Sequence, residues 1–230
     1  MQKITPTDAV QFSNYLNKFT YLSNPFYLCA NGLWIEKNNE KLVYEKDITD
    51  NKLKLLFLPR NFENIKGASI SAAFDEDLER LSQLGLNLKK KELFGYEYIY
   101  LTHDIISMEG SRFTQFRKSV KKFQNNYPFN ILNEYPKEKV IEFLNFWAKQ
   151  KNLNDKSDLT RNAFELDLKS SIEELDMLDF IPHKKIFIEI KGKLVGMTVF
   201  LQLHSNLWVA LMQKVDYNYA GLSRFLYHIK

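Results

Sequence analysis

The sequence predicts an α+β fold in which mixed sheets pack against helices, because short β-rich runs and amphipathic helices follow one another in two successive groups. The pairs Asn38-Asn39 and Lys191-Gly192 lie between β-rich runs and favour tight hairpins, which indicates antiparallel pairing. A meander followed by a helix occurs in each half. We therefore predict two domains, 1–103 and 104–230.

The composition is that of an ordinary globular protein, with 45% hydrophobic and 26% charged residues. A net charge of +4 is too small to indicate nucleic-acid binding by itself, and we expect no DNA partner. The single cysteine, Cys29, excludes an intrachain disulfide and is typical of a reducing compartment, so we expect a cytoplasmic protein. The chain lacks the run of about 18 apolar residues that a transmembrane segment needs.

In the first half, residues 7–19 predict a helix with Thr7 as its cap. Residues 74–88 predict another, with Leu78, Leu81 and Leu84 facing inward. The predicted strands of this half are 26–30, 33–37, 41–46, 53–58 and 96–101.

In the second half, residues 109–126 predict a strongly amphipathic helix. Its apolar stripe consists of Phe113, Phe116, Val120 and Phe123, and its other faces carry Arg112, Arg117, Lys118, Lys121 and Lys122. The remaining predicted elements are a strand at 129–134, helices at 136–149 and 159–178, strands at 185–190, 193–203 and 207–214, and a final helix at 219–230.

The passage from the last predicted strand into the last helix is a candidate anion site. A strand that ends in a turn before a helix presents backbone N–H groups and the positive end of a helix dipole, which suit a phosphate or pyrophosphate. Gly221 lies in this turn. The alternative is that Gly221 only permits tight packing between the helix and its neighbours.

The element order of the second half resembles the GCN5-related N-acetyltransferase fold. In particular, residues 215–226 look like the pyrophosphate-binding segment of that superfamily, Gln/Arg-x-x-Gly-x-Gly/Ala, with one of its glycines kept. The resemblance implies an acyl-coenzyme A donor.

A closer resemblance rests on several short motifs. They are Tyr98-Ile99-Tyr100, Met108-Glu109-Gly110, the helix 112–123, Tyr127-Pro128, and Gln213-Lys214-Val215 ahead of 221–226. Together they are similar to a bacterial family related to the C-terminal domain of phosphatidylglycerol lysyltransferases. This resemblance implies two tandem acetyltransferase-like domains, the second lacking its last strands, and aminoacyl transfer from aminoacyl-tRNA.

Such a fold implies particular site residues. Backbone N–H groups of Leu211, Met212 and Gln213 would hold the donor and stabilise an oxyanion. The turn residues that would bind the carrier are Asn218, Tyr219, Gly221, Leu222 and Ser223. Glu189 and Tyr217 are candidates for proton transfer, with water as an alternative.

Six cations are candidates for binding an anionic partner such as aminoacyl-tRNA or a lipid headgroup: Arg112, Arg117, Lys118, Lys121, Lys214 and Arg224. The alternative for the helical ones is a solvated basic face. No metal site is expected, because the histidines lack ligand spacing and the acidic residues of 165–179 are typical of an exposed helix face.

We therefore expect an acyl- or aminoacyltransferase whose acceptor is an amine or hydroxyl, such as that of a lipid headgroup. One alternative is a non-catalytic anion-binding module that retains the fold. Another is acetyl transfer to a small amine. Hydrolase and NTPase activities are disfavoured, because the sequence has neither a Gly-x-Ser-x-Gly elbow nor a Walker loop.

Overall fold

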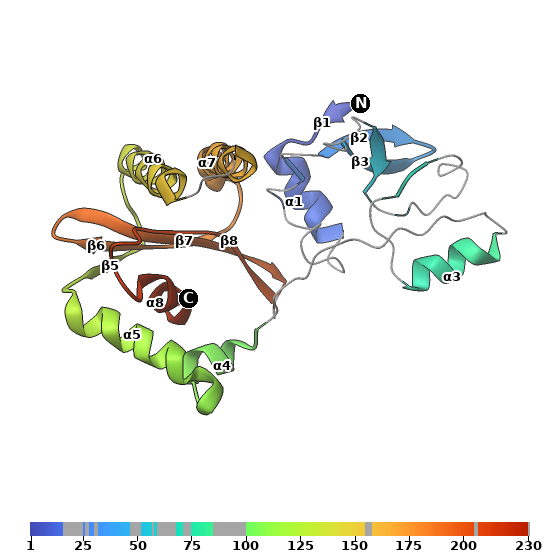
Figure 1. The fold of residues 1–230 in the computed structure, drawn as a ribbon. Coiled ribbons are helices and arrows are strands. Elements are labelled where there is room, and N and C mark those ends of the chain that lie inside the picture. The colour runs from blue at the N-terminus through green and yellow to red at the C-terminus, as the bar shows by residue number, and fades with distance from the viewer. Residues whose placement is uncertain are drawn as a thin grey trace. The chain divides into compact units, whose positions relative to one another are not determined.

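The computed structural model describes two compact units, Met1–Tyr96 and Glu97–Lys230 (Figure 1). The described residues are 1–15, 25, 28–29, 32–46, 52–56, 58, 68–70, 75–84, 100–154, 158–204 and 207–229. Within them, each unit combines helices with a four-stranded sheet, and every paired strand is antiparallel to its neighbour. The predicted α+β class is confirmed.

The first unit is a meander with the strand order β1-β2-β3-β4. Its elements are β1 (Gln2–Lys3), α1 (Pro6–Tyr15), β2 (Gly32–Lys37), β3 (Glu40–Lys46), β4 (Leu53–Leu55) and α3 (Asp75–Gln83). Asn38 and Asn39 have φ angles of 52° and 59° between β2 and β3, so the predicted hairpin is confirmed.

Two predictions for the first unit were wrong. Thr5 rather than Thr7 caps α1, because its hydroxyl accepts the Asp8 N–H (3.2 Å) while the Asp8 carboxylate accepts the Thr5 N–H (3.1 Å). Leu28 and Cys29 have helical backbone and are buried, although 26–30 predicted a strand. A short apolar run does not by itself distinguish a strand from a buried helical turn.

The inward face of α3 was predicted only in part. Leu81 packs in a core cluster with Leu42 and Leu55, whereas Leu84 is 45% exposed because the helix ends at Gln83. The predicted strand 96–101 is not found at Tyr100 and Leu101, and its other residues lie outside the described part of the chain.

The second unit has the strand order β5-β6-β7-β8. Its elements are α4 (Thr102–Ser107), η2 (Ser111–Phe113), α5 (Thr114–Asn126), β5 (Asn130–Leu132), α6 (Lys137–Asn154), α7 (Asp158–Met177), η3 (Leu178–Phe180), β6 (Lys184–Ile190), β7 (Lys193–His204), β8 (Leu207–Val215) and α8 (Leu222–His228). Figure 1 shows α6 and α7 on one face of the sheet and α5 and α8 on the other.

The core of the second unit lies between the sheet and the pair α5 and α8. Val120 and Phe123 of α5 are buried there, as the predicted apolar stripe requires. The Phe123 and Phe225 rings lie 4.9 Å apart between centroids, which joins α5 to α8. Gly196 in β7 leaves room for α8, since a Cβ there would lie 3.1 Å from the Leu222 and Leu226 side chains.

Among the described helices, none combines the length and the hydropathy that crossing a bilayer requires.

Candidate functional site

The candidate site begins at an irregularity in β8. In the pairing of β7 with β8, Val199 lies opposite Met212 and Phe200 lies opposite Ala210. Leu211 is therefore the extra residue of a β-bulge, a feature often found beside active sites. The bulge falls within the segment 211–213, which was predicted to hold the donor.

One side of β8 has no neighbouring strand among the described residues. The Asp216 N–H donates to the Val195 carbonyl (2.8 Å), and backbone groups alternate in direction along an antiparallel strand. Gln213 and Val215 therefore direct their backbone N–H and C=O groups away from β7. These groups are available to a bound molecule.

The turn after β8 uses several of its own amides. The Tyr219 N–H donates to the Asp216 carbonyl (3.2 Å), and the Leu222 N–H donates to the Tyr219 carbonyl (3.2 Å). The Asn218 N–H donates to the Asp216 carboxylate (3.0 Å). A carrier would have to contact other groups of this turn or displace these bonds.

Gly221 has a φ of +92°, a conformation that favours glycine. A Cβ on this residue would lie 2.2 Å from the Ser119 carbonyl oxygen of α5. Packing of the turn against α5 therefore accounts for the glycine by itself, which was the alternative left open by the sequence.

Gln213 and Ser223, both predicted site residues, lie in contact. The Gln213 side-chain Nε2 donates to the Ser223 carbonyl (3.2 Å) and hydroxyl (3.1 Å). The Gln213 Oε1 is buried and has no hydrogen-bond partner. These hydrogen bonds join the end of strand β8 to the start of α8 on the α5 side of the sheet.

Lys214 lies on the opposite face of β8, beneath α6 and α7. Its residue surface is 6% exposed, and its Nζ lies 2.6 Å from each Asp167 carboxylate oxygen. The same Nζ lies 4.1 Å from the centre of the Trp147 ring. A buried ammonium is stable only with such compensation, so the charge of Lys214 is already neutralised within the protein.

A second carboxyl group lies near this ion pair. Burial raises the pKa of Glu174 to about 7, with Lys214 opposing the rise and Asp167 adding to it. The hydroxyl of Ser171, which is 2% exposed, donates to Asp167 (3.4 Å). A carboxyl that titrates near neutrality beside a buried ion pair is typical of functional sites.

Tyr217 extends the network toward solvent. The Trp147 Nε1 donates to the Tyr217 hydroxyl oxygen (3.4 Å), and the Tyr217 N–H donates to the Gln150 side chain (3.3 Å). Tyr217 as a residue is nonetheless 49% exposed. Asp216 is buried and accepts a hydrogen bond from the Gln150 amide (2.9 Å), so α6 holds both residues of the turn.

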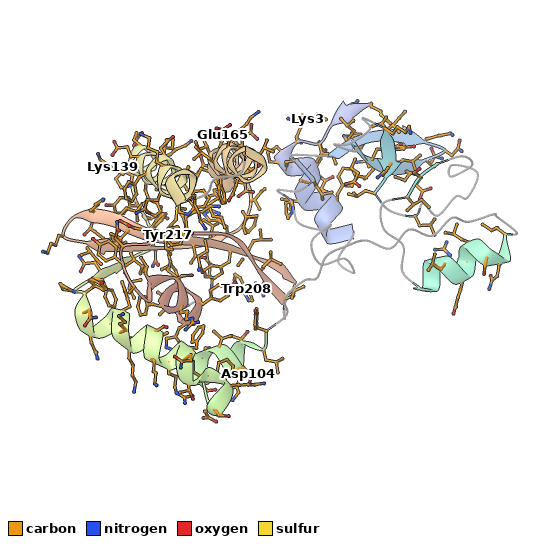
Figure 2. All side chains as sticks on the ribbon, in the orientation of Figure 1. Lys3, Asp104, Lys139, Glu165, Trp208 and Tyr217 are labelled. Atoms are coloured by element: carbon orange, nitrogen blue, oxygen red, sulfur yellow. The ribbon has the colours of Figure 1, made fainter. Side chains whose placement is uncertain are left out.

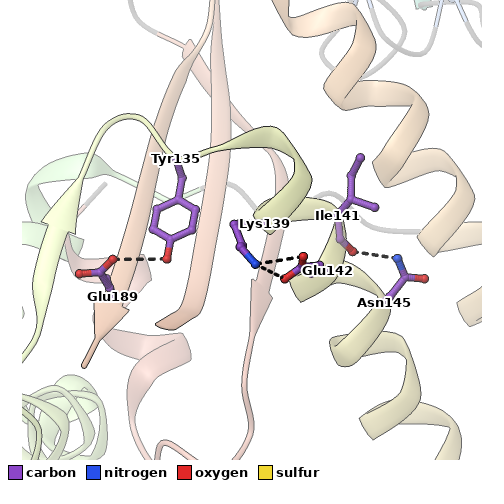
Figure 3. Close-up of polar contacts among 6 residues, drawn as sticks. All are labelled: Tyr135, Lys139, Ile141, Glu142, Asn145 and Glu189. Carbon is purple, nitrogen blue, oxygen red and sulfur yellow. Dashed lines mark hydrogen bonds and ion pairs between the residues drawn. The ribbon is translucent and has the colours of Figure 1, made fainter. Parts of the chain in front are cut away.

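Glu189 belongs to a different cluster. Its carboxylate accepts hydrogen bonds from the Tyr135 hydroxyl (3.3 Å) and the Asn130 amide (3.3 Å), the former shown in Figure 3. Because β7 lies between β6 and β8, Glu189 is about two strand spacings, or ~10 Å, from the end of β8. The two candidates for proton transfer are therefore not brought together.

Besides Lys214, three of the predicted anion-binding residues are used inside the protein. Arg112 pairs with Asp104 (2.6 Å), and Arg117 donates to the Met108 and Gly110 carbonyls, the latter at 2.9 Å. Arg224 donates to the Gln115 carbonyl (2.9 Å) and the Ser119 hydroxyl (2.8 Å). In contrast, the side chains of Lys118 and Lys121 are exposed.

The sequence also raises the questions of a reactive cysteine and of a metal site. Burial raises the pKa of Cys29 to about 11, which keeps the thiol protonated and unreactive. Within the described ranges, no group of three His, Cys, Asp or Glu side chains could hold a metal ion.

Comparison with protein families shows which family this chain belongs to. The family described as phosphatidylglycerol lysyltransferase, C-terminal, matches residues 68–228. The chain belongs to this family. The resemblance drawn from the sequence motifs is thereby confirmed, and the match includes β8, its bulge and the turn into α8. The lysyltransferase C-terminal family thus relates the chain to transferases.

A solved structure of similar fold is a conserved protein of unknown function from Bacteroides thetaiotaomicron VPI-5482. It is 14% identical, with a TM-score of 0.72 over 99% of this chain and 84% of that one. At this identity the likeness shows the fold alone. A search of curated proteins gave no significant match.

Asp167 and Glu174 were missed as site residues of this lysyltransferase-family chain, because the acidic residues of 165–179 were interpreted as a solvated helix face. Asp167, Ser171 and Glu174 are spaced by four and three, which places them on one side of a helix. That spacing could have indicated a polar inward face. It could not have indicated Lys214 as the partner.

Proposed function

We propose that this protein transfers an aminoacyl or acyl group from a carrier to an amine or hydroxyl acceptor such as a lipid headgroup. Family membership supports transferase chemistry. The observation that carries the proposal is the bulged, unpaired side of β8 next to the buried Lys214–Asp167 pair. The donor would be aminoacyl-tRNA or acyl-coenzyme A, and the proposed architecture is two tandem GCN5-related N-acetyltransferase-like domains, 1–103 and 104–230.

Within 211–213, Gln213 would bind the donor through its backbone, whereas the Met212 N–H is directed toward β7. The outward N–H of Gln213 can donate a hydrogen bond to the donor's acyl carbonyl oxygen, as it would to a neighbouring strand. The acceptor oxygen or nitrogen attacks this carbonyl, and negative charge develops on its oxygen. The bond to the carrier then breaks, and the carrier leaves as a free hydroxyl or thiol.

Protons must move in both steps. The acceptor loses one proton, and the leaving oxygen or sulfur gains one. Tyr217 is the better placed of the two candidates, because its exposed hydroxyl lies at the end of β8 and is oriented by Trp147. Glu189 remains a candidate base, although Tyr135 and Asn130 already occupy its oxygens.

The test measures transfer directly. The full chain is incubated with radiolabelled aminoacyl-tRNA and phosphatidylglycerol vesicles, and in parallel with labelled acetyl-coenzyme A and small amines. We expect label in the lipid fraction, and we expect Tyr217→Phe to lower the rate about 100-fold. Tyr44→Phe, in β3 of the first unit, is the matched control. Absence of transfer from both donors to every acceptor would overturn the proposal.

A further inference from the structure

Two aromatic rings hold an ammonium group near the end of α6. The Nζ of Lys151, in the last turn of that helix, lies over the Tyr217 ring (4.7 Å to its centre) and over the Phe164 ring (5.5 Å). Both distances are within the ~6 Å at which a ring face attracts a cation. The rings come from α7 and from the turn after β8, so the fold brings them together. We name Phe164 and Tyr217 the ring pair.

Residues other than Lys151 fix the position of the ring pair. The Trp147 indole, which is 4% exposed, packs edge-on against Phe164, with ring centroids 6.4 Å apart and an interplanar angle of 83°. Its Nε1 donates to the Tyr217 hydroxyl oxygen (3.4 Å), and the Gln150 side chain accepts the Tyr217 N–H (3.3 Å). Because a buried and closely packed ring contacts both members, their arrangement does not depend on the cation above them.

The ring pair can be reached from solvent. Tyr217 is 49% exposed, and Phe164 and Lys151 are half-buried. Figure 2 shows Tyr217 on the side of the sheet that α6 and α7 cover. The lysine ammonium is carried on a flexible four-carbon stem. Lys151 can therefore move aside and leave the two ring faces to a ligand that carries a cation of similar size.

The surroundings of Lys151 indicate which kind of cation the ring pair suits. Within the described part of the chain, no residue gives its ammonium an ion pair or a hydrogen bond. The neighbouring Lys214 differs, because its Nζ lies 2.6 Å from both carboxylate oxygens of Asp167. A lysine ammonium has three N–H donors, which ring faces do not satisfy as oxygen atoms do. A quaternary ammonium has no N–H group, and aromatic rings are the usual recognition element for it.

We propose that the ring pair is a binding site for a quaternary ammonium group, and that Lys151 covers the site when this ligand is absent. The ligand displaces one cation by another over the same rings. The displaced lysine ammonium passes to solvent, where water satisfies its three donors, so the exchange leaves no buried charge unpaired. This binding goes beyond the proposed transfer of an acyl group. The two proposals can fail separately, because binding is measured without any donor or carrier.

The test titrates choline into the full chain by isothermal titration calorimetry at constant ionic strength. The matched probe is the carbon analogue of choline, in which a tert-butyl group replaces the trimethylammonium group and removes only the charge. We expect choline to bind at least about 10-fold more tightly than this analogue, and more tightly than butylammonium, whose N–H donors the rings leave unsatisfied. A parallel arm uses phosphatidylcholine vesicles. Binding to them that requires Phe164 would identify a lipid headgroup as the source, and binding of choline alone would identify a free compound.

Two variants change the site in opposite directions. Lys151→Ala should bind choline about 10-fold more tightly, because it removes the internal cation that competes for the rings. Its matched control is Lys149→Ala, an exposed lysine of the same helix, which should stay within about twofold because its charge acts only through screening solvent. Phe164→Leu should bind choline about 10-fold more weakly. Phe180→Leu, which removes an exposed ring outside the ring pair, should leave the affinity unchanged.

Four results would overturn the proposal. They are equal affinity for choline and its carbon analogue, tighter binding of butylammonium than of choline, unchanged affinity in the Lys151 variant, and equal affinity in the Phe164 and Phe180 variants. The Lys151 variant keeps the test valid if loss of the Phe164 ring disturbs folding, because an exposed lysine stem is removed there and binding is expected to rise.

Discussion

The two faces of the second sheet differ in what they bury. The face toward α5 and α8 is apolar, and Val215 of β8 lies in its cluster with Phe225. The face toward α6 and α7 buries charge, and the preceding residue of the same strand, Lys214, is paired there with Asp167. Alternation along one strand thus places a packing surface and a charged cluster back to back.

The two faces therefore contribute differently to folding and to function. The apolar face can hold α8 and the turn in place through burial and close packing, which tolerate no loss of fit. The charged face stabilises little in net terms, because desolvation of the ions offsets much of their attraction. Residues that are costly for folding are retained where chemistry requires them, which makes the Lys214 face the better candidate for function.

The largest expected effect comes from breaking the close approach on the α5 side. Gly221→Ala should lower the free energy of unfolding by about 3–4 kcal/mol, because the new Cβ meets the Ser119 carbonyl and φ is +92°. The measurement is urea unfolding followed by tryptophan fluorescence.

The control for Gly221 is Gly192→Ala. Gly192 also has a positive φ of +74°, but a Cβ there would meet nothing within 4 Å. Gly192→Ala should lower the free energy of unfolding by only about 1 kcal/mol, which is the cost of the positive φ without a steric clash. Equal losses for the two variants would show that packing against α5 is not what requires glycine at position 221.

A smaller effect is expected from breaking the ion pair on the α6 and α7 side. Lys214→Met should cost about 2–3 kcal/mol in the same unfolding assay, because it leaves Asp167 uncompensated with 44% of its side chain exposed. The double variant K214M/D167L should recover to within about 1 kcal/mol of the unmodified protein. If the double variant is no more stable than the single one, the pair does more for stability than we infer.

The smallest effect concerns the pH dependence of the charged face. The pKa of Glu174 is raised to about 7 from 4.5, so the folded state holds its proton more tightly than the unfolded state. The resulting stability is complete below about pH 4.5 and is lost as pH rises through 7. After allowance for partial exposure, we expect a loss of about 1–2 kcal/mol between pH 5 and pH 8.

Glu174→Gln should remove this slope and unfold at higher urea than the unmodified protein at pH 8. Glu165→Gln, at an exposed position of the same helix, is the matched control and should keep the slope. A slope that persists in the Glu174 variant would assign the titration to another group.

Much of the second unit could be predicted because its signals are local. The predicted stripe of Phe113, Phe116, Val120 and Phe123 repeats at helical spacing, and the structure buries Val120 and Phe123 and half-buries the other two. The strand predicted at 26–30 was wrong because a run of five residues is too short to show a period. The cap predicted at Thr7 was wrong because Thr5 followed by Pro6 is the more favourable helix start.

The candidate site was less predictable than the fold. Leu211 was selected by resemblance, but its bulge depends on the register between β7 and β8. Arg117 and Arg224 are predicted anion-binding residues, and in the structure they donate to backbone carbonyl oxygens. Backbone carbonyl oxygens are also acceptors for a guanidinium, and only the folded chain shows whether one is within reach.

The sequence alone determined most elements of the second unit, the apolar side of α5 and the family, because periodicity and motifs are recorded in neighbouring residues. Only the tertiary structure decided which charged side chains have partners within the protein and which are exposed. Lys214 and Asp167 lie 47 residues apart, and their pairing follows from how α7 crosses β8. Coulomb attraction depends on distance in space and on burial, and neither can be read from separation along the chain.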